Sequence, residues 1–198
     1  MTRLLEQLHL PSGTPRQLEH WAGIDLYAVA ESIHDVLFDG GVCLPLTWME
    51  GTVVAPVVDW DQASLAHRLA EGSGPVLDRA LLRDMAYDPP TWASPVLTMT
   101  GFTTFGPMRR AGGALALLSG MARVVAAVPA PPGAMFWDAM ECDIHGFSVV
   151  EASTAGTRVL FEGHPGPAPG SLPVLHQQWL MQEQLFDVAQ RFGAVPQL

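Results

Sequence analysis

Residues 134–164, AMFWDAMECDIHGFSVVEASTAGTRVLFEGH, contain the longest regular alternation of apolar and polar residues in the chain. From Met140 onward, apolar and polar side chains fall on opposite faces, a period of two that is typical of a half-buried strand. Turn residues at 153–156 separate this run from a second alternating run at 157–162. The stretch therefore predicts an antiparallel hairpin, around which we expect the rest of the fold to be organised.

The register of this hairpin follows from its side chains. A loop centred between Thr154 and Ala155 pairs Val150 with Val159 and Ser148 with Phe161 on the apolar face. The same register sets Glu151 opposite Arg158, and opposite charges that face each other contribute roughly 0.2–1 kcal/mol. A slip of one residue would turn every side chain to the wrong face, so this register is preferred.

Extended down the ladder, the register places His145 opposite His164, with Asp143 and Glu162 in diagonal positions. Directly opposed Cβ atoms lie about 4.5–5.5 Å apart, and two histidines with a carboxylate form a known metal-ligand set. Either Glu162 or Glu141 would serve as a further ligand or general base. The competing interpretation is a solvated polar face whose histidines have no ligand.

The composition excludes several classes of function. All ten basic residues are arginine, so lysine Schiff-base chemistry, a pyridoxal-phosphate anchor and a Walker A loop are ruled out. A formal charge of −10 argues against binding to nucleic acid or to an anionic membrane and is compatible with a basic partner surface. Cys43 and Cys142 are expected to be reduced, buried thiols, and we expect a cytoplasmic protein.

The other elements are predicted from periodicity and capping residues. Apolar stripes predict helices over 25–38, 62–71 (with Asp61 as N-cap), 73–86 and 171–192. A second hairpin is expected over 42–58, turning at Glu50-Gly51 through a four-residue loop. A strand is expected over 95–105, with a bulge or close backbone contact at Gly101. The apolar run Ala111 to Val128 predicts one buried core helix, followed by a stiff connector at 129–133.

These elements do not alternate regularly between strand and helix. We therefore predict one α+β domain over residues 1–198, with an antiparallel β-sheet built from hairpins and covered by several α-helices.

Two hypotheses of function remain. The first is a non-catalytic, acidic protein–protein interaction protein of the adaptor, secretion-chaperone or immunity type, without a cofactor. Its partner-binding residues would be Leu4 and Leu8 of an N-terminal amphipathic helix and Trp179, Gln178 and Gln182 of the C-terminal helix. The outer face of the C-terminal helix carries glutamines in place of charged residues, which is also compatible with a homo-oligomer. The alternative is a small metal-dependent enzyme with one divalent ion held on the 140–164 hairpin.

Overall fold

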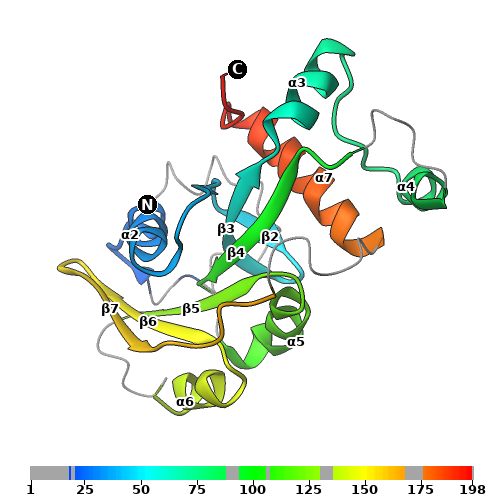
Figure 1. Ribbon diagram of the computed structural model, residues 1–198. Coiled ribbons are helices and arrows are strands. Elements are labelled where there is room, and N and C mark those ends of the chain that lie inside the picture. Colours follow the sequence, from blue (N-terminus) through cyan, green and yellow to red (C-terminus); the bar gives the residue numbers. More distant parts are fainter. Residues whose placement is uncertain are drawn as a thin grey trace.

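A single mixed β-sheet forms the centre of the molecule (Figure 1). The computed structural model describes residue 18 and residues 21–87, 94–105, 108–129, 136–167 and 176–197. The sheet has seven strands in the order β1-β3-β4-β5-β6-β7, and β2 pairs with β3 beside β1. The strands are β1 (Val42–Cys43), β2 (Thr47–Met49), β3 (Thr52–Trp60), β4 (Leu97–Thr104), β5 (Arg123–Pro129), β6 (Ser148–Ser153) and β7 (Gly156–Phe161).

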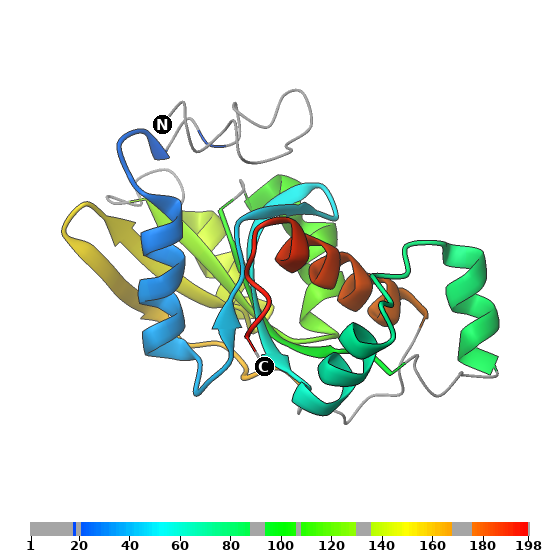
Figure 2. The same ribbon diagram turned by 90° about the horizontal axis from the view of Figure 1, so that it is seen from above.

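Helices cover both faces of this sheet (Figure 2). They are α2 (Leu26–Leu37), α3 (Gln62–Ala70), α4 (Arg79–Tyr87), α5 (Met108–Ser119), α6 (Phe136–Ile144) and α7 (His176–Arg191). Helix α2 packs on one face, and α3, α5, α6 and α7 contribute to the core on the other. Successive residues of β5 alternate between the two cores, as the period of a strand requires: Val124 and Ala126 face one, Val125 and Ala127 the other.

The sheet is mixed, so the expected purely antiparallel sheet is wrong. Strands β4, β5 and β6 run parallel, joined through α5 and α6, whereas the β3–β4 and β6–β7 pairs are antiparallel. The apolar run 111–128, expected to be one helix, is the end of α5, a turn, and most of β5. Its second half carries β-branched Val124, Val125 and Val128, which favour a strand buried on both faces.

The segment 140–147, expected to be a strand, is helical up to Ile144. Helix α6 ends in a Schellman motif, in which Gly146 N–H donates to Asp143 O (2.9 Å) and Phe147 N–H donates to Cys142 O (2.9 Å). Gly146 takes the left-handed conformation that this motif needs, with φ 75°. The apparent period-two pattern here was therefore a coincidence, and the glycine was the better signal.

The β6–β7 hairpin has the expected register at its tip. Val150 pairs with Val159 and Glu151 pairs with Arg158, whose guanidinium donates to the Glu151 carboxylate (2.7 Å). Further down, Phe161 pairs with Val149 and not with Ser148 as expected, because a bulge shifts the register between Val149 and Val150. The prediction was thus correct near the turn and wrong beyond the bulge.

The second expected hairpin is confirmed in β2 and β3, with its turn at Glu50-Gly51. Met49 pairs with Thr52, so the connection is a two-residue turn and not the expected four-residue loop. Both turn residues have positive φ, 49° at Glu50 and 86° at Gly51, as a type I′ turn requires.

The predicted N-cap of α3 is confirmed, and α2 begins with a capping residue of the same kind. The Asp25 carboxylate accepts from Tyr27 N–H (3.0 Å) at the start of α2, and Asp61 accepts from Ser64 N–H (2.9 Å) at the start of α3. Helix α4 begins later than expected, after Asp78, which accepts from Ala80 N–H (2.8 Å). Gly101 shows both expected features, since a bulge interrupts the β3–β4 ladder beside it and the Phe38 ring packs against it.

Both edges of the sheet carry features that discourage further strand pairing. Edge strand β7 contains the bulge described above, and Pro45 separates β1 from β2 at the other edge.

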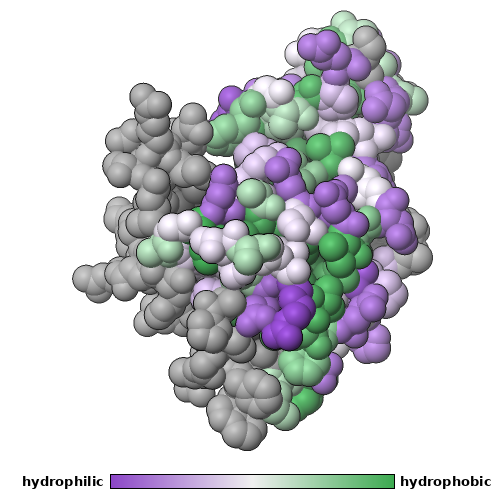
Figure 3. Space-filling view, turned by 90° about the vertical axis from the view of Figure 1, so that its left-hand side faces the viewer, coloured by the Kyte–Doolittle hydropathy of each residue, from purple (hydrophilic) through white to green (hydrophobic). Residues whose placement is uncertain are grey.

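Figure 3 faces the side of α2 and the β6–β7 hairpin and shows a hydrophilic cluster next to a run of apolar surface. In the described part of the chain, no helix combines the length and apolar character needed to cross a bilayer.

Candidate binding groove

Two adjoining cavities lie along helix α7. The first, of about 300 Å³, lies between α4, α7 and the β2–β3 turn. The second, of about 270 Å³, lies between α7 and β2. Glu50 and Gln184 line both cavities, so they form one continuous depression. We call it the α7 groove and define it by residues 47–50, Arg79, Leu82 and the side of α7 from Gln177 to Val188.

Helix α7 provides one wall because its lining residues share one face. Gln177, Leu180, Gln184 and Val188 recur at intervals of three or four residues, the spacing of one helical stripe. At a rise of about 1.5 Å per residue, this wall is about 16 Å long. The side chains of Leu180 and Met181 are buried at its base, with Leu82 of α4 beside them. The floor of the first cavity is therefore apolar.

A buried ion pair fixes the elements that carry the groove. Arg68 of α3 forms a bidentate pair with Glu183 of α7, with both N–O distances at 2.9 Å, and neither side chain is more than 1% exposed. Glu183 also accepts from Val76 N–H (2.8 Å) and from Trp179 Nε1 (3.3 Å). Arg68 donates to Gly74 O as well. The pair thereby ties α3 and the segment that leads to α4 onto α7.

Helix α4 is held against α7 by a small apolar cluster. Leu82 and Met85 of α4 pack with Trp179 and Leu180 of α7, and all four side chains are buried. Figure 1 shows α4 beside the N-terminal end of α7, at the margin of the molecule. Because Arg79 is the first residue of α4, this contact brings its guanidinium to the rim of the first cavity.

The rim of the groove is polar, and its main charges are unpaired. Glu50 and Arg79 are exposed, and within the described residues neither takes part in an ion pair. Asp187, at the other end, pairs with Arg191 (2.6 Å), one helical turn further along α7. Gln177 and Gln184 add exposed amides. A carboxylate, a guanidinium and amides thus surround an apolar floor, a combination suited to binding an amphipathic ligand.

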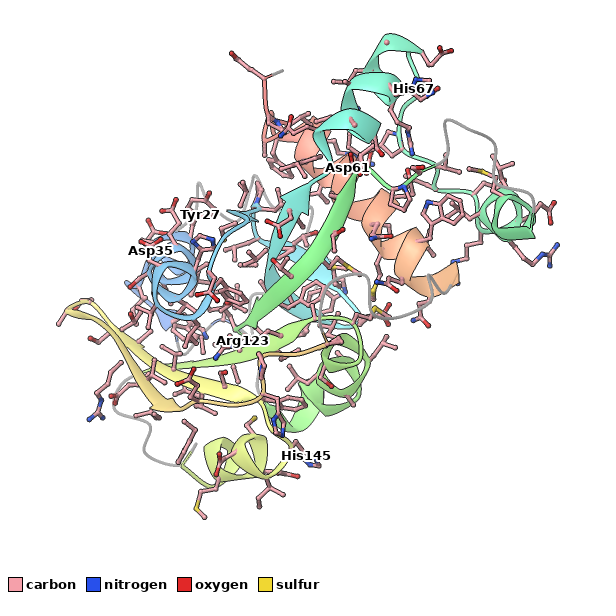
Figure 4. The ribbon with its side chains drawn as sticks, in the orientation of Figure 1. Tyr27, Asp35, Asp61, His67, Arg123 and His145 are labelled. Atoms are coloured by element: carbon pink, nitrogen blue, oxygen red, sulfur yellow. The ribbon has the colours of Figure 1, made fainter. Side chains whose placement is uncertain are left out.

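The expected metal set is arranged differently from the prediction. Asp143 lies in the last turn of α6 and His145 just beyond it, so His145 cannot pair with His164 across a ladder (Figure 4). His164 follows β7 and donates its backbone N–H to Gly146 O (2.8 Å), while Glu162 accepts from Arg123 (3.3 Å). Among the described residues, no three His, Cys, Asp or Glu side chains are grouped to hold a metal ion.

The expected partner-binding residues of α7 are largely buried. Trp179 and Gln182 are each 5% exposed; Trp179 donates to Glu183, and Gln182 donates to Leu97 O (2.9 Å). Gln178 is partly buried. Trp179 and Gln182 thus pack α7 onto the body and do not form an outer face, which corrects the sequence interpretation for these two residues. Leu4 and Leu8 lie outside the described residues.

Cys43, on edge strand β1, has a thiol with a raised pKa. Burial, and secondarily the nearby Glu31 carboxylate, raises its pKa to about 12. Desolvation disfavours the thiolate, and the negative charge of Glu31 adds to that effect. At neutral pH the sulfur is therefore protonated and is a poor nucleophile or metal ligand.

Comparisons of the chain with protein-family models, with curated proteins and with solved structures found no match.

The sequence predicted the Glu50-Gly51 turn but did not identify Glu50, Arg79 and Gln184 as candidate binding residues. The one local signal was a glutamate at a turn position where asparagine, aspartate or glycine is favoured. The groove itself is assembled from three elements far apart in the sequence.

Proposed function

We propose that this chain is a non-catalytic interaction protein, of the adaptor, secretion-chaperone or immunity type, that binds another protein through the α7 groove. The observation that carries the proposal is the groove itself, with buried Leu82, Leu180 and Met181 at its floor and polar side chains at its rim. An apolar centre with a polar rim is the usual anatomy of a protein interface. The polar side chains of the first cavity are Glu50, Arg79, Gln177 and Gln184, and the proposal assigns them to binding.

The acidic balance of the chain supports a partner with a basic surface. The formal net charge is −10, and Glu50 adds an exposed carboxylate to a groove whose other charges are Arg79 and the Asp187–Arg191 pair. Opposite charges across an interface mainly increase the association rate, and salt screens this contribution. The complex is therefore expected to weaken as the salt concentration is raised.

The test compares two variants of the same helix. Gln184→Trp fills the groove, because Gln184 lines both cavities, whereas Gln190→Trp adds the same ring to an exposed site of α7 that lines neither. A partner recovered from the native cell would be purified and titrated against wild type and both variants. We expect binding to be lost with Gln184→Trp and retained with Gln190→Trp. Equal binding by all three proteins would refute the groove as the docking site.

A further inference from the structure

The charges along the α7 groove follow a fixed order. Arg79 lines only the first cavity, Glu50 lies where the two cavities meet, and Asp187 lines only the second. The apolar floor of Leu180 and Met181 belongs to the first cavity, whose lining also includes Arg79 and Glu50. Since Asp187 is already paired with Arg191, Glu50 is the carboxylate available to a bound cation.

The backbone at Glu50 is set by the type I′ turn between β2 and β3. Among the described residues, Glu50 is the only non-glycine residue with positive φ. Asparagine, aspartate or glycine would suit the turn better, and of these only aspartate carries a carboxylate, on a side chain one methylene shorter than that of Glu50.

We infer that the partner segment bound in the α7 groove presents three groups in order: a lysine or arginine side chain at Glu50, an apolar side chain on the floor of Leu82, Leu180 and Met181, and a carboxylate at Arg79. This inference rests on the proposed function, since it describes the occupant of the same groove. The cation and the carboxylate each meet an unpaired opposite charge. Such charge-assisted hydrogen bonds are stronger than neutral ones and specify the orientation of the segment.

The apolar group supplies the anchor between the two charged contacts. The first cavity, at about 300 Å³, lies at the small end of the range for ligand sites and accepts one large side chain with its neighbours. Burial of such a side chain contributes most of the affinity at an interface centre, while the charged rim sets the orientation.

The test uses a displayed library of random peptides of roughly a dozen residues, long enough to follow the wall of about 16 Å. Peptides enriched on wild type would be counter-selected against Gln184→Trp, which blocks the groove. One enriched peptide would then be titrated against the double variant Glu50→Arg/Arg79→Glu, which reverses both rim charges and leaves the net charge unchanged. A second peptide, with its charged residues inverted, would be titrated against the same proteins.

We expect the enriched peptide to bind the double variant at least about tenfold more weakly than wild type, and the inverted peptide to show the opposite preference. Replacing its apolar anchor by serine should also weaken binding. If groove-dependent peptides bind wild type and the double variant equally, the charge order is wrong while the docking groove stands. If no peptide is enriched, or if enriched peptides bind Gln184→Trp as well, both the charge order and the docking groove are wrong.

Glu50→Asn separates binding from stability. Asparagine is favoured in this turn, so the variant should melt about 2 °C higher than wild type. It should nevertheless lose affinity for the enriched peptide, because the carboxylate is gone. Reduced affinity together with a lower melting temperature would indicate damage to the turn and would count against a direct role for Glu50; unchanged affinity would overturn that role outright.

Discussion

At the scale of single residues, Gly101 shows how closely α2 is fitted to the sheet. The Phe38 ring, just beyond the end of α2, lies directly on Gly101 of β4, and a Cβ at this position would overlap it. The guanidinium of Arg123 on β5 also lies over the Phe38 ring, 5.9 Å from its centre. The guanidinium also donates to Leu37 O and reaches Ser148 Oγ, which connects α2 to β5 and β6.

Gly101→Ala is therefore expected to lower the free energy of unfolding by about 1–3 kcal/mol, because the added methyl group overpacks the site. In a Phe38→Ala background the same substitution should cost much less. Gly112→Ala is the control, since nothing lies within 4 Å of a Cβ there and alanine favours the helix. Urea unfolding of the set measures these values. An equal cost in both backgrounds would contradict the contact.

Cys43 gives a prediction about pH. With its pKa raised to about 12, the thiol should react slowly with alkylating reagents at pH 8, and the rate should still increase above pH 10. Because the folded state disfavours the thiolate, protonated Cys43 contributes stability that is lost as the pH rises from the ordinary thiol range toward 12. A Cys142→Ala chain isolates the signal, and the urea-unfolded chain is the control. Equal rates in folded and unfolded chain at pH 8 would contradict the shift.

At the scale of elements, α3, α4 and α7 depend on the Arg68–Glu183 pair. Removing one partner of a buried charge pair is strongly destabilising, because the other charge stays buried without a counter-charge. Arg68→Met should lower the free energy of unfolding by about 3–5 kcal/mol at neutral pH, because it leaves the Glu183 carboxylate buried and unpaired.

The double variant Arg68→Met/Glu183→Leu should recover a large part of that loss. Denaturant unfolding of the four proteins forms a double-mutant cycle that isolates the interaction. Strictly additive effects of the two substitutions would show that the pair is not coupled.

Local signals in the sequence predicted several of these elements well. Asp25 and Asp61 marked helix starts, and the facing charges of Glu151 and Arg158 fixed a hairpin register. Where two local patterns competed, the prediction failed: alternation around Cys142 concealed a helix that Gly146 ends, and a continuous apolar run concealed the junction between α5 and β5. Because of these two errors, the predicted order of elements lacked the regular alternation of helix and strand. Without that alternation, the parallel part of the sheet was not predicted.

At the scale of the whole molecule, the candidate site depends on long-range assembly. The β2–β3 turn, α4 and α7 meet only because β3 and β4 are neighbours in the sheet and α7 returns to pack against them. No local period could reveal that Glu50 would lie beside Gln184. Likewise, the burial of Trp179, Gln182 and Glu183 follows from partners distant in sequence, including Leu97 and Arg68. The sequence thus shows the acidic balance of the chain but not the place of the groove.

The most direct test of the account is hydrogen–deuterium exchange of the chain, alone and in complex with its purified partner. Slower exchange of amides at 47–51, at the start of α4 and along α7 from Gln177 to Val188 is the predicted result, because a bound segment would shield these elements from solvent. Protection confined to α6 and the β6–β7 hairpin, with exchange in the groove unchanged, would contradict docking in the α7 groove. That result would favour a binding site near His145 and His164 instead.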